Sequence, residues 1–488
     1  MIIIIFKMML LKFILLMLVT TTNVIALNTP KESNDTIGGN WKTYVVNPEL
    51  FSLLLTPLNL TDSHYISELQ EACDLQDSLT DEQINIIRYW DIGAILGWNK
   101  IARNFAAKYN QPPLFGIKIN PIRPYTSPPI ASRIYALLSV AQFDALVCAW
   151  KIKYMYHRIA PLYLNLEIKQ IVPISKEFPT YPSEHAVVAR TSSEILKFLF
   201  PGDSAQIERL VLEHCQSRIH AGANTRSEIL AGDLLGRLVA AQVIAYAKTD
   251  GAINARGGDT LFTNPIHWIS QLKKPLPPML PLWGAVRMWN IRSVSVVSAG
   301  PPPTIGSAGF KSALDEVYYI SLHRTYNQLR IVQFWADGFN TSSPPGHWNE
   351  IAEGLIRENN FSEIRAARTF ALLNTALMDA GISCWSTKYT YIYPRPSQMD
   401  SRILPATGLP NFPSYTSGHA AFSGAAATVL SYIFPASAQA LDSMAQEAAM
   451  SRLYGGIHYR FDNDSGLVCG RRVGAYAIER GQKDGSLP

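Results

Sequence analysis

Apolar residues recur along the chain at steps of three and four positions, the spacing that gathers them on one face of an α-helix. The clearest segments of this kind cover residues 81–109, 133–150, 185–200 and 230–247, and the pattern returns in the C-terminal half. Strict alternation of apolar and polar residues, which is typical of strands, is scarce. The pattern therefore predicts an all-α protein.

The chain also matches itself. The sequence Arg133-Ile-Tyr-Ala-Leu-Leu recurs as Arg368-Thr-Phe-Ala-Leu-Leu, 235 positions later, and an Asp-Ala pair, a Trp and a Lys-Tyr pair follow at the same offset. The offset then becomes 234, so that Phe178-Pro-Thr-Tyr aligns with Phe412-Pro-Ser-Tyr. Rare residues that agree in order over this length indicate an internal duplication.

The duplication predicts two related helical bundles of the four-helix type, packed together so that each buries apolar residues of the other. Between them lies a segment rich in proline, which prevents a helix from continuing. The expected divisions are a signal peptide (1–26), an N-terminal extension (27–85), a first, degenerate bundle (86–260), a proline-rich linker (261–310) and a second, catalytic bundle (311–488).

The first residues are strongly apolar, contain Lys7 and Lys12, and end in the small-residue pattern Val24-Ile25-Ala26. This pattern predicts a secretory signal peptide cleaved after Ala26, with a membrane anchor as the alternative. The mature protein is therefore expected to be secreted and extracellular, or periplasmic in a bacterium. No later segment has about 20 uninterrupted apolar residues, so no further contact with a membrane is expected.

Composition narrows the possible functions. Hydrophobic residues make up 48% of the 488 positions and charged residues 17%, as in compact globular proteins of two domains. The net charge of +5 is small and no stripe of Lys and Arg stands out, which argues against nucleic-acid binding. The cysteines predict neither a disulfide framework nor a metal site, because their spacing is wide and irregular: Cys73, Cys148, Cys215, Cys384 and Cys469.

Three segments of the second copy carry candidate chemistry. In the first, Lys388 precedes Arg395 by seven positions, and a point charge with a planar fork of donors suits a tetrahedral oxyanion. In the second, Ser417-Gly418-His419 opens an apolar helical run. A helix N-terminus offers free N–H groups and a positive dipole end, so an anion could bind beside Gly418 and the Ser417 hydroxyl.

The third segment contains Ser451-Arg452, then His458 and Asp462. Asp462 stands four positions after His458 and could fix its tautomer if the helix continued through both. Each of these side chains alone is more often a surface charge, a structural histidine or a helix cap. The three segments in this order and spacing predict one oxyanion site.

Together the segments resemble the signature of the superfamily of vanadium-dependent haloperoxidases and type 2 phosphatidic acid phosphatases: Lys, six residues, Arg-Pro; Pro-Ser-Gly-His; and Ser-Arg, five residues, His, three residues, Asp. The resemblance covers 311–488 and, as a degenerate echo, much of 86–260. Thr416 stands where the family usually has Pro and is expected to loosen the turn. The resemblance implies that Lys388, Arg395, Ser417, Gly418 and Arg452 bind the oxyanion, that His458 bonds to its central atom, and that His419 acts as acid–base.

Features around this site resemble the haloperoxidase branch. Trp385 and Phe412 resemble the aromatic pair beside the cofactor of fungal-type vanadium chloroperoxidases, although both could be core aromatics, since aromatic residues also stand at the aligned positions of the first copy. The segment around Asp337 resembles a helix of the same branch, and Asp337 is expected to pair with Arg452.

The resemblance thus implies a haloperoxidase that binds vanadate and uses hydrogen peroxide to oxidise a halide to hypohalous acid, which reacts with a small organic substrate. Vanadium would act as a Lewis acid without changing its oxidation state. The alternatives are a secreted acid phosphatase with His458 as the phosphorylated nucleophile, and a secreted binding protein without catalysis. The halide stays open at this point.

The first copy has lost part of the pattern. It keeps Lys153, Ser183, His185 and Arg218. Three positions change, because Gly418, His458 and Arg395 align with Glu184, Asn224 and Ala160. A carboxylate repels an anion at short range, and Asn cannot take the place of the imidazole ligand. The first bundle is therefore expected to be inactive and to serve as a scaffold and as a packing or dimerisation partner within a homodimer.

Overall fold

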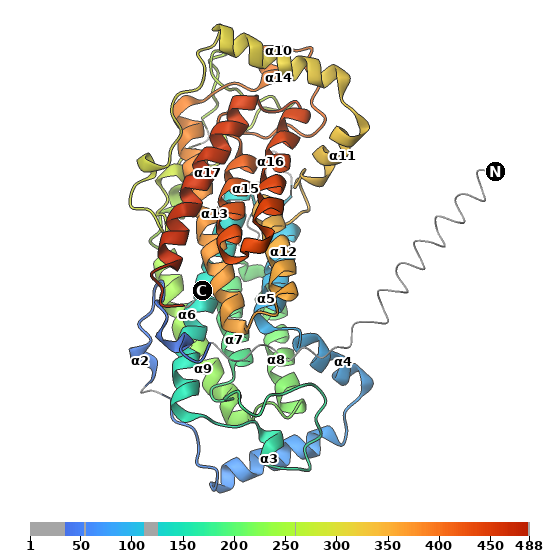
Figure 1. The fold of residues 1–488 in the computed structure, drawn as a ribbon, viewed down its shortest axis with the longest axis vertical. Coiled ribbons are helices and arrows are strands. Elements are labelled where there is room, and N and C mark those ends of the chain that lie inside the picture. Colours follow the sequence, from blue (N-terminus) through green and yellow to red (C-terminus); the bar gives the residue numbers. More distant parts are fainter. Residues whose placement is uncertain (1–34, 53–54, 112–124, 259, 487–488) are drawn as a thin grey trace, which may run out of the picture.

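The computed structural model describes residues 35–52, 55–111, 125–258 and 260–486, and the predicted signal peptide lies outside them. The α-helices are α2 (Glu49–Ser52), α3 (Ser63–Gln76), α4 (Asp81–Trp90), α5 (Ala94–Tyr109), α6 (Pro128–Tyr156), α7 (Glu184–Leu199), α8 (Ser204–His220), α9 (Arg226–Ala247), α10 (Ala308–His323), α11 (Tyr326–Phe334), α12 (Ser343–Glu358), α13 (Glu363–Tyr391), α14 (Pro396–Met399), α15 (Gly418–Ile433), α16 (Ala438–Tyr454) and α17 (Arg460–Gly481) (Figure 1). Short 3-10 helices connect some of them, and the described residues contain no strand. The prediction of an all-α fold is confirmed.

The helix predicted over 81–109 is wrong in one respect, since the structure divides it into α4 and α5. Gly93 separates the two helices and has a φ of 121°, a backbone conformation that residues with a Cβ rarely adopt. The apolar spacing continues across this break, which explains why the pattern suggested one helix.

The helices repeat in order and length. In the first half of the molecule (α3–α9), α6, α7, α8 and α9 contain 29, 16, 17 and 22 residues. In the second half (α10–α17), α13, α15, α16 and α17 contain 29, 16, 17 and 22 residues. Figure 1 shows the two sets stacked along the long axis of the molecule. This repetition is what the predicted duplication requires.

The two long helices α6 and α13 pack against each other and join the halves. The Asn374 amide on α13 donates over 2.9 Å to the hydroxyl of Ser139, the aligned residue on α6, and the Asn99 amide on α5 donates over 2.9 Å to Asn349 on α12. All four side chains are fully buried. Contacts between aligned residues are expected when two related units face each other about an approximate two-fold axis.

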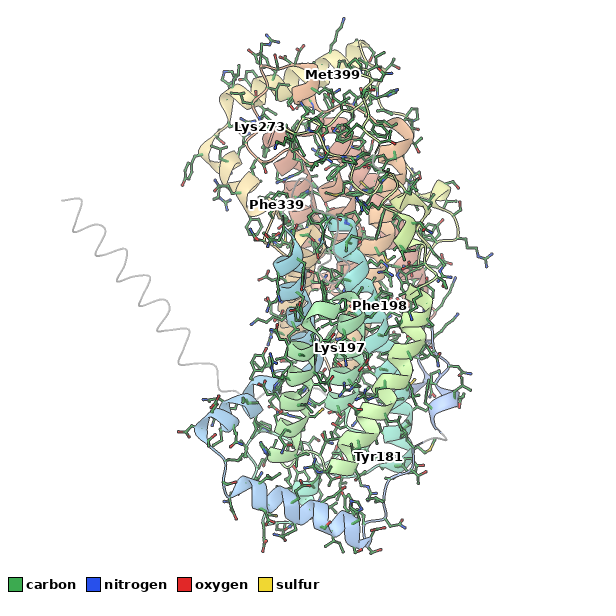
Figure 2. All side chains as sticks on the ribbon, turned by 180° about the vertical axis from the view of Figure 1, so that it is seen from behind. Tyr181, Lys197, Phe198, Lys273, Phe339 and Met399 are labelled. Atoms are coloured by element: carbon green, nitrogen blue, oxygen red, sulfur yellow. The ribbon has the colours of Figure 1, made fainter. Side chains whose placement is uncertain are left out.

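In each half, an extended segment also packs against the long helix. The Asp144 carboxylate on α6 accepts hydrogen bonds from the backbone N–H groups of residues 44–46. The aligned Asp379 on α13 accepts from the N–H groups of Trp289 and Asn290 in the proline-rich linker. Figure 2 shows Lys273 of this linker beside the second half, far from Tyr181 in the first. The linker is therefore packed onto the second bundle as the N-terminal extension is packed onto the first.

The core consists of the inner faces of these helices, and Trp98, Trp150, Trp348 and Trp385 are among its fully buried side chains. Two segments, Pro128–Tyr163 and Arg226–Ala247, are long and apolar enough to cross a membrane. In the first of them, 89% of the apolar window is buried inside the protein, which is typical of a core helix.

Helices α15 and α17 approach each other at Gly470. A Cβ added there would lie 2.2 Å from the Ala421 carbonyl oxygen, too close for any real contact. We expect Gly470→Ala to lower the free energy of unfolding by about 1–3 kcal/mol, because the helices must move apart. Gly354 on α12 has no atom within 4 Å of such a Cβ. Gly354→Ala should be neutral or stabilising by up to about 1 kcal/mol in denaturant titration, and equal effects from both changes would contradict close packing.

Candidate oxyanion site

The structure brings the three predicted segments together at one end of the second bundle. Lys388 lies in the last turn of α13, and Arg395 directly precedes α14. Ser417 is the N-cap of α15, Arg452 lies in the last turn of α16, and His458 lies in the turn before α17. All five side chains are buried, with exposures of 2% or less. Residues separated by 70 positions of sequence thus form one buried, cationic cluster.

The imidazole of His458 is held from both sides. Its Nδ1 lies 2.8 Å from Asp462 Oδ2, and its Nε2 lies 2.9 Å from Arg395 Nη1. Arginine can only donate, so Nε2 accepts and the ring proton is on Nδ1, where it is donated to Asp462. Burial and the nearby Arg395 and Lys388 lower the pKa of His458 well below its usual value. His458 is therefore neutral, with a lone pair on Nε2 directed into the cluster.

The predicted helical continuation through His458 and Asp462 is wrong. Helix α17 begins at Arg460, so Asp462 lies in its first turn and reaches back to His458. The same carboxylate oxygen also accepts from the Tyr459 N–H over 3.2 Å and from the Ser414 hydroxyl over 2.5 Å. A residue in the first helical turn commonly accepts bonds from the preceding backbone. Asp462 therefore fixes the tautomer by capping the helix.

The ammonium group of Lys388 holds the turn before α15. Its Nζ donates to the carbonyl oxygens of Pro413, Ser414 and Thr416 over 2.7, 2.9 and 2.5 Å. These bonds use all three N–H groups of a lysine. Burial lowers the pKa of Lys388 to about 7. Thr416 itself is fully buried. The hydrogen bond from Lys388 to its carbonyl holds the turn at the position where the family usually has proline.

The two arginines also bond to backbone groups. Arg395 donates to the Phe412 carbonyl from Nε and Nη2 and to the Ile457 carbonyl from Nη1. Arg452 donates from Nε to the Ser451 hydroxyl over 2.9 Å and from Nη2 to a carbonyl on α11 over 3.2 Å. Burial lowers the pKa of each arginine to about 10, so both stay charged at neutral pH. An oxyanion bound here would share or replace some of these partners.

The start of α15 closes the cluster. Ser417 accepts from the Ala420 N–H, and its own N–H donates to the Asp462 carbonyl over 2.9 Å. Gly418 is the first helical residue and is buried, so its N–H group stands at the positive end of the helix dipole. His419 follows, and its buried Nε2 has no hydrogen-bond partner among the described residues. The burial of this ring, with Arg452 nearby, lowers the pKa of His419 well below its usual value.

Asp337 does not pair with Arg452 as expected. Its Oδ1 lies 3.1 Å from His347 Nδ1. Its Oδ2 lies 3.8 Å from His419 Nε2 and has no hydrogen-bond partner in the part of the chain that the structure describes. Its negative charge acts on Arg452 only from a distance, where it opposes the lowering of the arginine pKa by burial. The resemblance implied that Asp337 lies near the site as a partner of Arg452, but the structure places its carboxylate beside His347 and His419.

Trp385 and Phe412 lie beside the cations. Their ring centroids are 5.0 Å apart, and Lys388 Nζ lies 4.9 Å from the Phe412 centroid. The indole N–H of Trp385 donates to the Met279 carbonyl of the linker. The aligned rings Trp150 and Phe178 make a similar pair, 5.5 Å apart. The pair therefore contributes to the core in both halves, and in the second half it also packs against the cationic cluster.

Two residues of the site were missed by sequence reasoning: Ser414, which donates to Asp462, and His347, which holds Asp337. A signal for Ser414 existed. The aligned Thr180 also has a hydroxyl, and it donates over 2.9 Å to Glu228, which aligns with Asp462. A hydroxyl kept in both copies indicated this contact. His347 had no counterpart that would have singled it out.

In the first half, the polar residues of the degenerate pattern bond to one another. Lys153 Nζ lies 2.6 Å from Glu184 Oε2, the Ser183 hydroxyl donates to Asn224 over 2.8 Å, and Arg218 pairs with an aspartate at the end of α4 over 3.2 Å. The charge that Glu184 adds is therefore neutralised inside the protein. The inactivity of this half stays a prediction.

The pKa of Lys388 leads to a prediction about anion affinity. Lys388 is charged below about pH 7 and loses its proton as the pH rises through that value. Sulfate keeps the same charge over this range, so its affinity should fall by up to about tenfold per pH unit above the pKa. Isothermal titration calorimetry from about pH 6 to pH 8.5 measures this. Lys388→Arg keeps its charge and should flatten the profile, while an unchanged slope would show that Lys388 is not responsible.

Solved structures share this fold. The chain is similar to a bacterial vanadium-dependent iodoperoxidase, with 24% identity and a TM-score of 0.63 over 79% of this chain and 96% of that one. It is similar to a holo-type bacterial vanadium-dependent chloroperoxidase, with 15% identity and a TM-score of 0.56 over 79% and 97% of the two chains. An apo-type bacterial vanadium-dependent chloroperoxidase matches with 16% identity and a TM-score of 0.56 over 74% and 95%. The chain therefore has the all-α fold of these haloperoxidases.

A family comparison supports the same relationship. Residues 368–484 match the family model described as PAP2 superfamily. This segment contains the three motifs from Lys388 to Asp462, and the match confirms the predicted resemblance to this superfamily. No curated protein sequence matches the chain.

Proposed function

We propose that the protein is a vanadium-dependent haloperoxidase, which uses hydrogen peroxide to oxidise a halide to hypohalous acid that then reacts with a small organic compound. The observation that carries the proposal is the setting of His458. Its Nε2 lone pair points at Arg395, its Nδ1 proton is held by Asp462, and the charges of Lys388 and Arg452 also act on it. The fold shared with three solved haloperoxidases supports the same function.

The residues of this cluster fit vanadate. Lys388, Arg395 and Arg452 are buried cations, and burial lowers the pKa of each. A tetrahedral oxyanion with more than one negative charge would compensate them and accept hydrogen bonds from the start of α15. A neutral imidazole nitrogen is a common metal ligand, as His458 Nε2 would be. When bound, vanadate supplies a Lewis-acidic centre that polarises an oxygen ligand.

His419 is suited to move a proton beside this cluster. One ring nitrogen bonds to the backbone of Trp335, while Nε2 is buried without a partner. Because the lowered pKa leaves the ring neutral, Nε2 could accept a proton from hydrogen peroxide and hold it beside the cluster. The Asp337 oxygen at 3.8 Å would stabilise the imidazolium form. His347 keeps Asp337 in this position.

The test is an assay of the purified protein with hydrogen peroxide, bromide and a phenolic dye, with and without orthovanadate. We expect halogenation that depends on vanadate. Halogenation that is independent of vanadate, or its absence together with efficient hydrolysis of para-nitrophenyl phosphate, would contradict the proposal. The second result would favour the acid phosphatase, for which the same cations would bind phosphate and His458 would be the nucleophile. Inactivity in both assays would favour a binding protein.

A further inference from the structure

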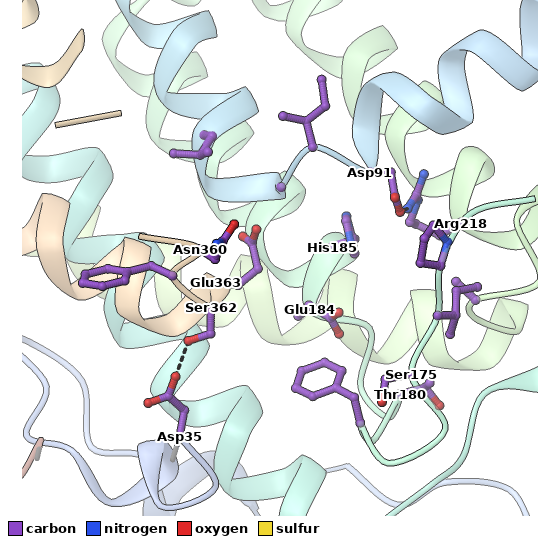
Figure 3. Close-up of a pocket in the computed structure, with 18 of the residues that line it drawn as sticks. Asp35, Asp91, Ser175, Thr180, Glu184, His185, Arg218, Asn360, Ser362 and Glu363 are labelled. Atoms are coloured by element: carbon purple, nitrogen blue, oxygen red, sulfur yellow. Dashed lines mark hydrogen bonds and ion pairs between the residues drawn. The ribbon is translucent and has the colours of Figure 1, made fainter. Parts of the chain in front are cut away.

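The first half contains a cavity of about 780 Å³ at the place that corresponds to the oxyanion site of the second half. We call it the first-half cavity. It is bounded by the end of α4, the start of α7, the loop at 170–180 and the start of α13 from the other half (Figure 3). Pockets for small ligands have volumes of about 300–1,000 Å³. The cavity is therefore large enough for a small organic molecule.

The positive charges around the first-half cavity are already compensated. Lys153 is paired with Glu184 over 2.6 Å, and Arg218 with Asp91 over 3.2 Å. Arg357 at the opposite wall pairs with a glutamate on its own helix over 2.8 Å. Ala160 stands where the second half has Arg395. Among the described residues around the cavity, an anion would therefore find no uncompensated cation, in contrast to the second half.

Three of the four carboxylates that line the cavity are paired with cations, and the fourth, Glu363, accepts backbone N–H groups instead. Glu184 and Asp91 belong to the ion pairs described above, and Asp35 pairs with Arg365 over 2.6 Å. Glu363 accepts the Ile95 N–H over 2.9 Å at the start of α5, and burial raises its pKa to about 7. A buried charge without a partner is costly. A cation therefore gains little in the cavity, and the compensated lining favours an uncharged ligand.

The floor of the cavity presents a fixed hydrogen-bond donor. The Trp98 indole N–H donates to His214 Nδ1 over 3.1 Å, and His214 Nε2 lies 2.9 Å from His185 Nδ1. Burial lowers the pKa of both histidines, to about 3 for His185, so each carries one proton. Because His214 Nδ1 accepts from Trp98, its proton is on Nε2 and is donated to His185. The proton of His185 is therefore on Nε2, the nitrogen left for the cavity.

An acceptor lies directly beside this donor. Glu184 and His185 are consecutive at the start of α7, and Figure 3 shows both side chains at the floor of the cavity, between the Asp91–Arg218 pair and Glu363. A hydroxyl group can accept from His185 Nε2 and donate to the Glu184 carboxylate at the same time. A ketone or ether could use only the first contact, and an aliphatic amine would carry a charge.

The walls near this floor are aromatic. Trp150 and Phe178 have ring centroids 5.5 Å apart at an angle of 59°, and Phe361 lines the cavity from the second half. Aromatic side chains favour aromatic ligands through edge-to-face and offset stacking. We propose that the first-half cavity binds a small uncharged aromatic compound with a hydroxyl group, its ring against Trp150 and Phe178 and its hydroxyl between His185 and Glu184. This proposal does not depend on the proposed catalytic function.

Isothermal titration calorimetry of the full chain with three molecules of similar ring system tests the chemistry. The probes are 2-naphthol, the anion 2-naphthoate and the cation 2-naphthylmethylammonium. We expect one 2-naphthol per chain, bound at least about tenfold more tightly than either charged probe, since a charge would be buried without a partner. No binding of 2-naphthol, or tighter binding of either charged probe, would overturn the proposal.

Variants locate the site. Ser175 lies in a loop at the cavity and is not buried, so Ser175→Trp should fill the space and abolish 2-naphthol binding. The neighbouring Lys176 is exposed and does not line the cavity, and Lys176→Trp should bind as the natural protein does. Both variants should keep the thermal midpoint. Binding should also persist in His458→Ala. Undiminished binding in Ser175→Trp, or its loss in His458→Ala, would place the site elsewhere and overturn the proposal.

Discussion

Replacing His458 with alanine should remove vanadate-dependent halogenation by about a thousandfold or more. The change deletes the Nε2 atom that contacts Arg395 and would bind the vanadium. His185→Ala, in the first half, should leave the rate nearly unchanged, because Glu184 and Asn224 replace the anion-binding glycine and the histidine there. Steady-state kinetics with bromide and peroxide at saturating vanadate measure both variants.

Equal losses in His458→Ala and His185→Ala would mean that the first half also contains a working site. Circular dichroism of the two variants provides the control for folding, since both histidines are buried or nearly so.

The second large effect is expected from Asp462→Asn. The carboxylate accepts the Nδ1 proton of His458 over 2.8 Å. An asparagine amide would donate to Nδ1 and drive the ring proton to Nε2, which would remove the lone pair that faces the cluster. Loss of a carboxylate that orients a histidine lowers activity or metal affinity by about 10²- to 10⁴-fold.

Asp464 provides the matched control, because it lies two residues further along α17 and is exposed. Asp464→Asn should retain full activity and vanadate affinity. If Asp462→Asn kept the activity of this control, Asp462 would not determine the tautomer of His458. A loss of thermal stability alone, with unchanged vanadate affinity per folded molecule, would also contradict this role of Asp462.

Much of the fold could be predicted from local patterns. The three- and four-residue spacing located the main helices, and the offset between Arg133 and Arg368 predicted helices that the structure shows with equal lengths. The break at Gly93 was missed because apolar spacing is insensitive to one residue with positive φ. The prolines predicted that helices do not continue through the linker, whereas the contact of the linker with Asp379 depends on tertiary packing.

The site was predictable as a set of residues but not as a set of contacts. The motifs named Lys388, Arg395 and His458, which the structure places together. They could not show that Lys388 donates all its protons to the turn before α15, or that Asp337 faces His419 and His347. Such contacts depend on where a side chain is directed by its neighbours, and spacing along the chain carries no information on that.

The first half illustrates the same limit. The glutamate at the position aligned with Gly418 predicted that the first half does not bind anions. In the structure Glu184 pairs with Lys153, so this lysine is not available to an anion. The cavity could not be predicted, because part of its wall is formed by residues at the start of α13 in the other half. The loss of one ligand-binding pattern therefore did not imply the loss of a pocket.

Anomalous diffraction from crystals soaked in orthovanadate tests whether His458 Nε2 binds the metal. We expect one vanadium peak per chain, at bonding distance from His458 Nε2, with Arg395 and Arg452 around its oxygens and the start of α15 beside it. A peak next to Asn224 in the first half, or a vanadium position at which His458 Nε2 still contacts only Arg395, would contradict this coordination.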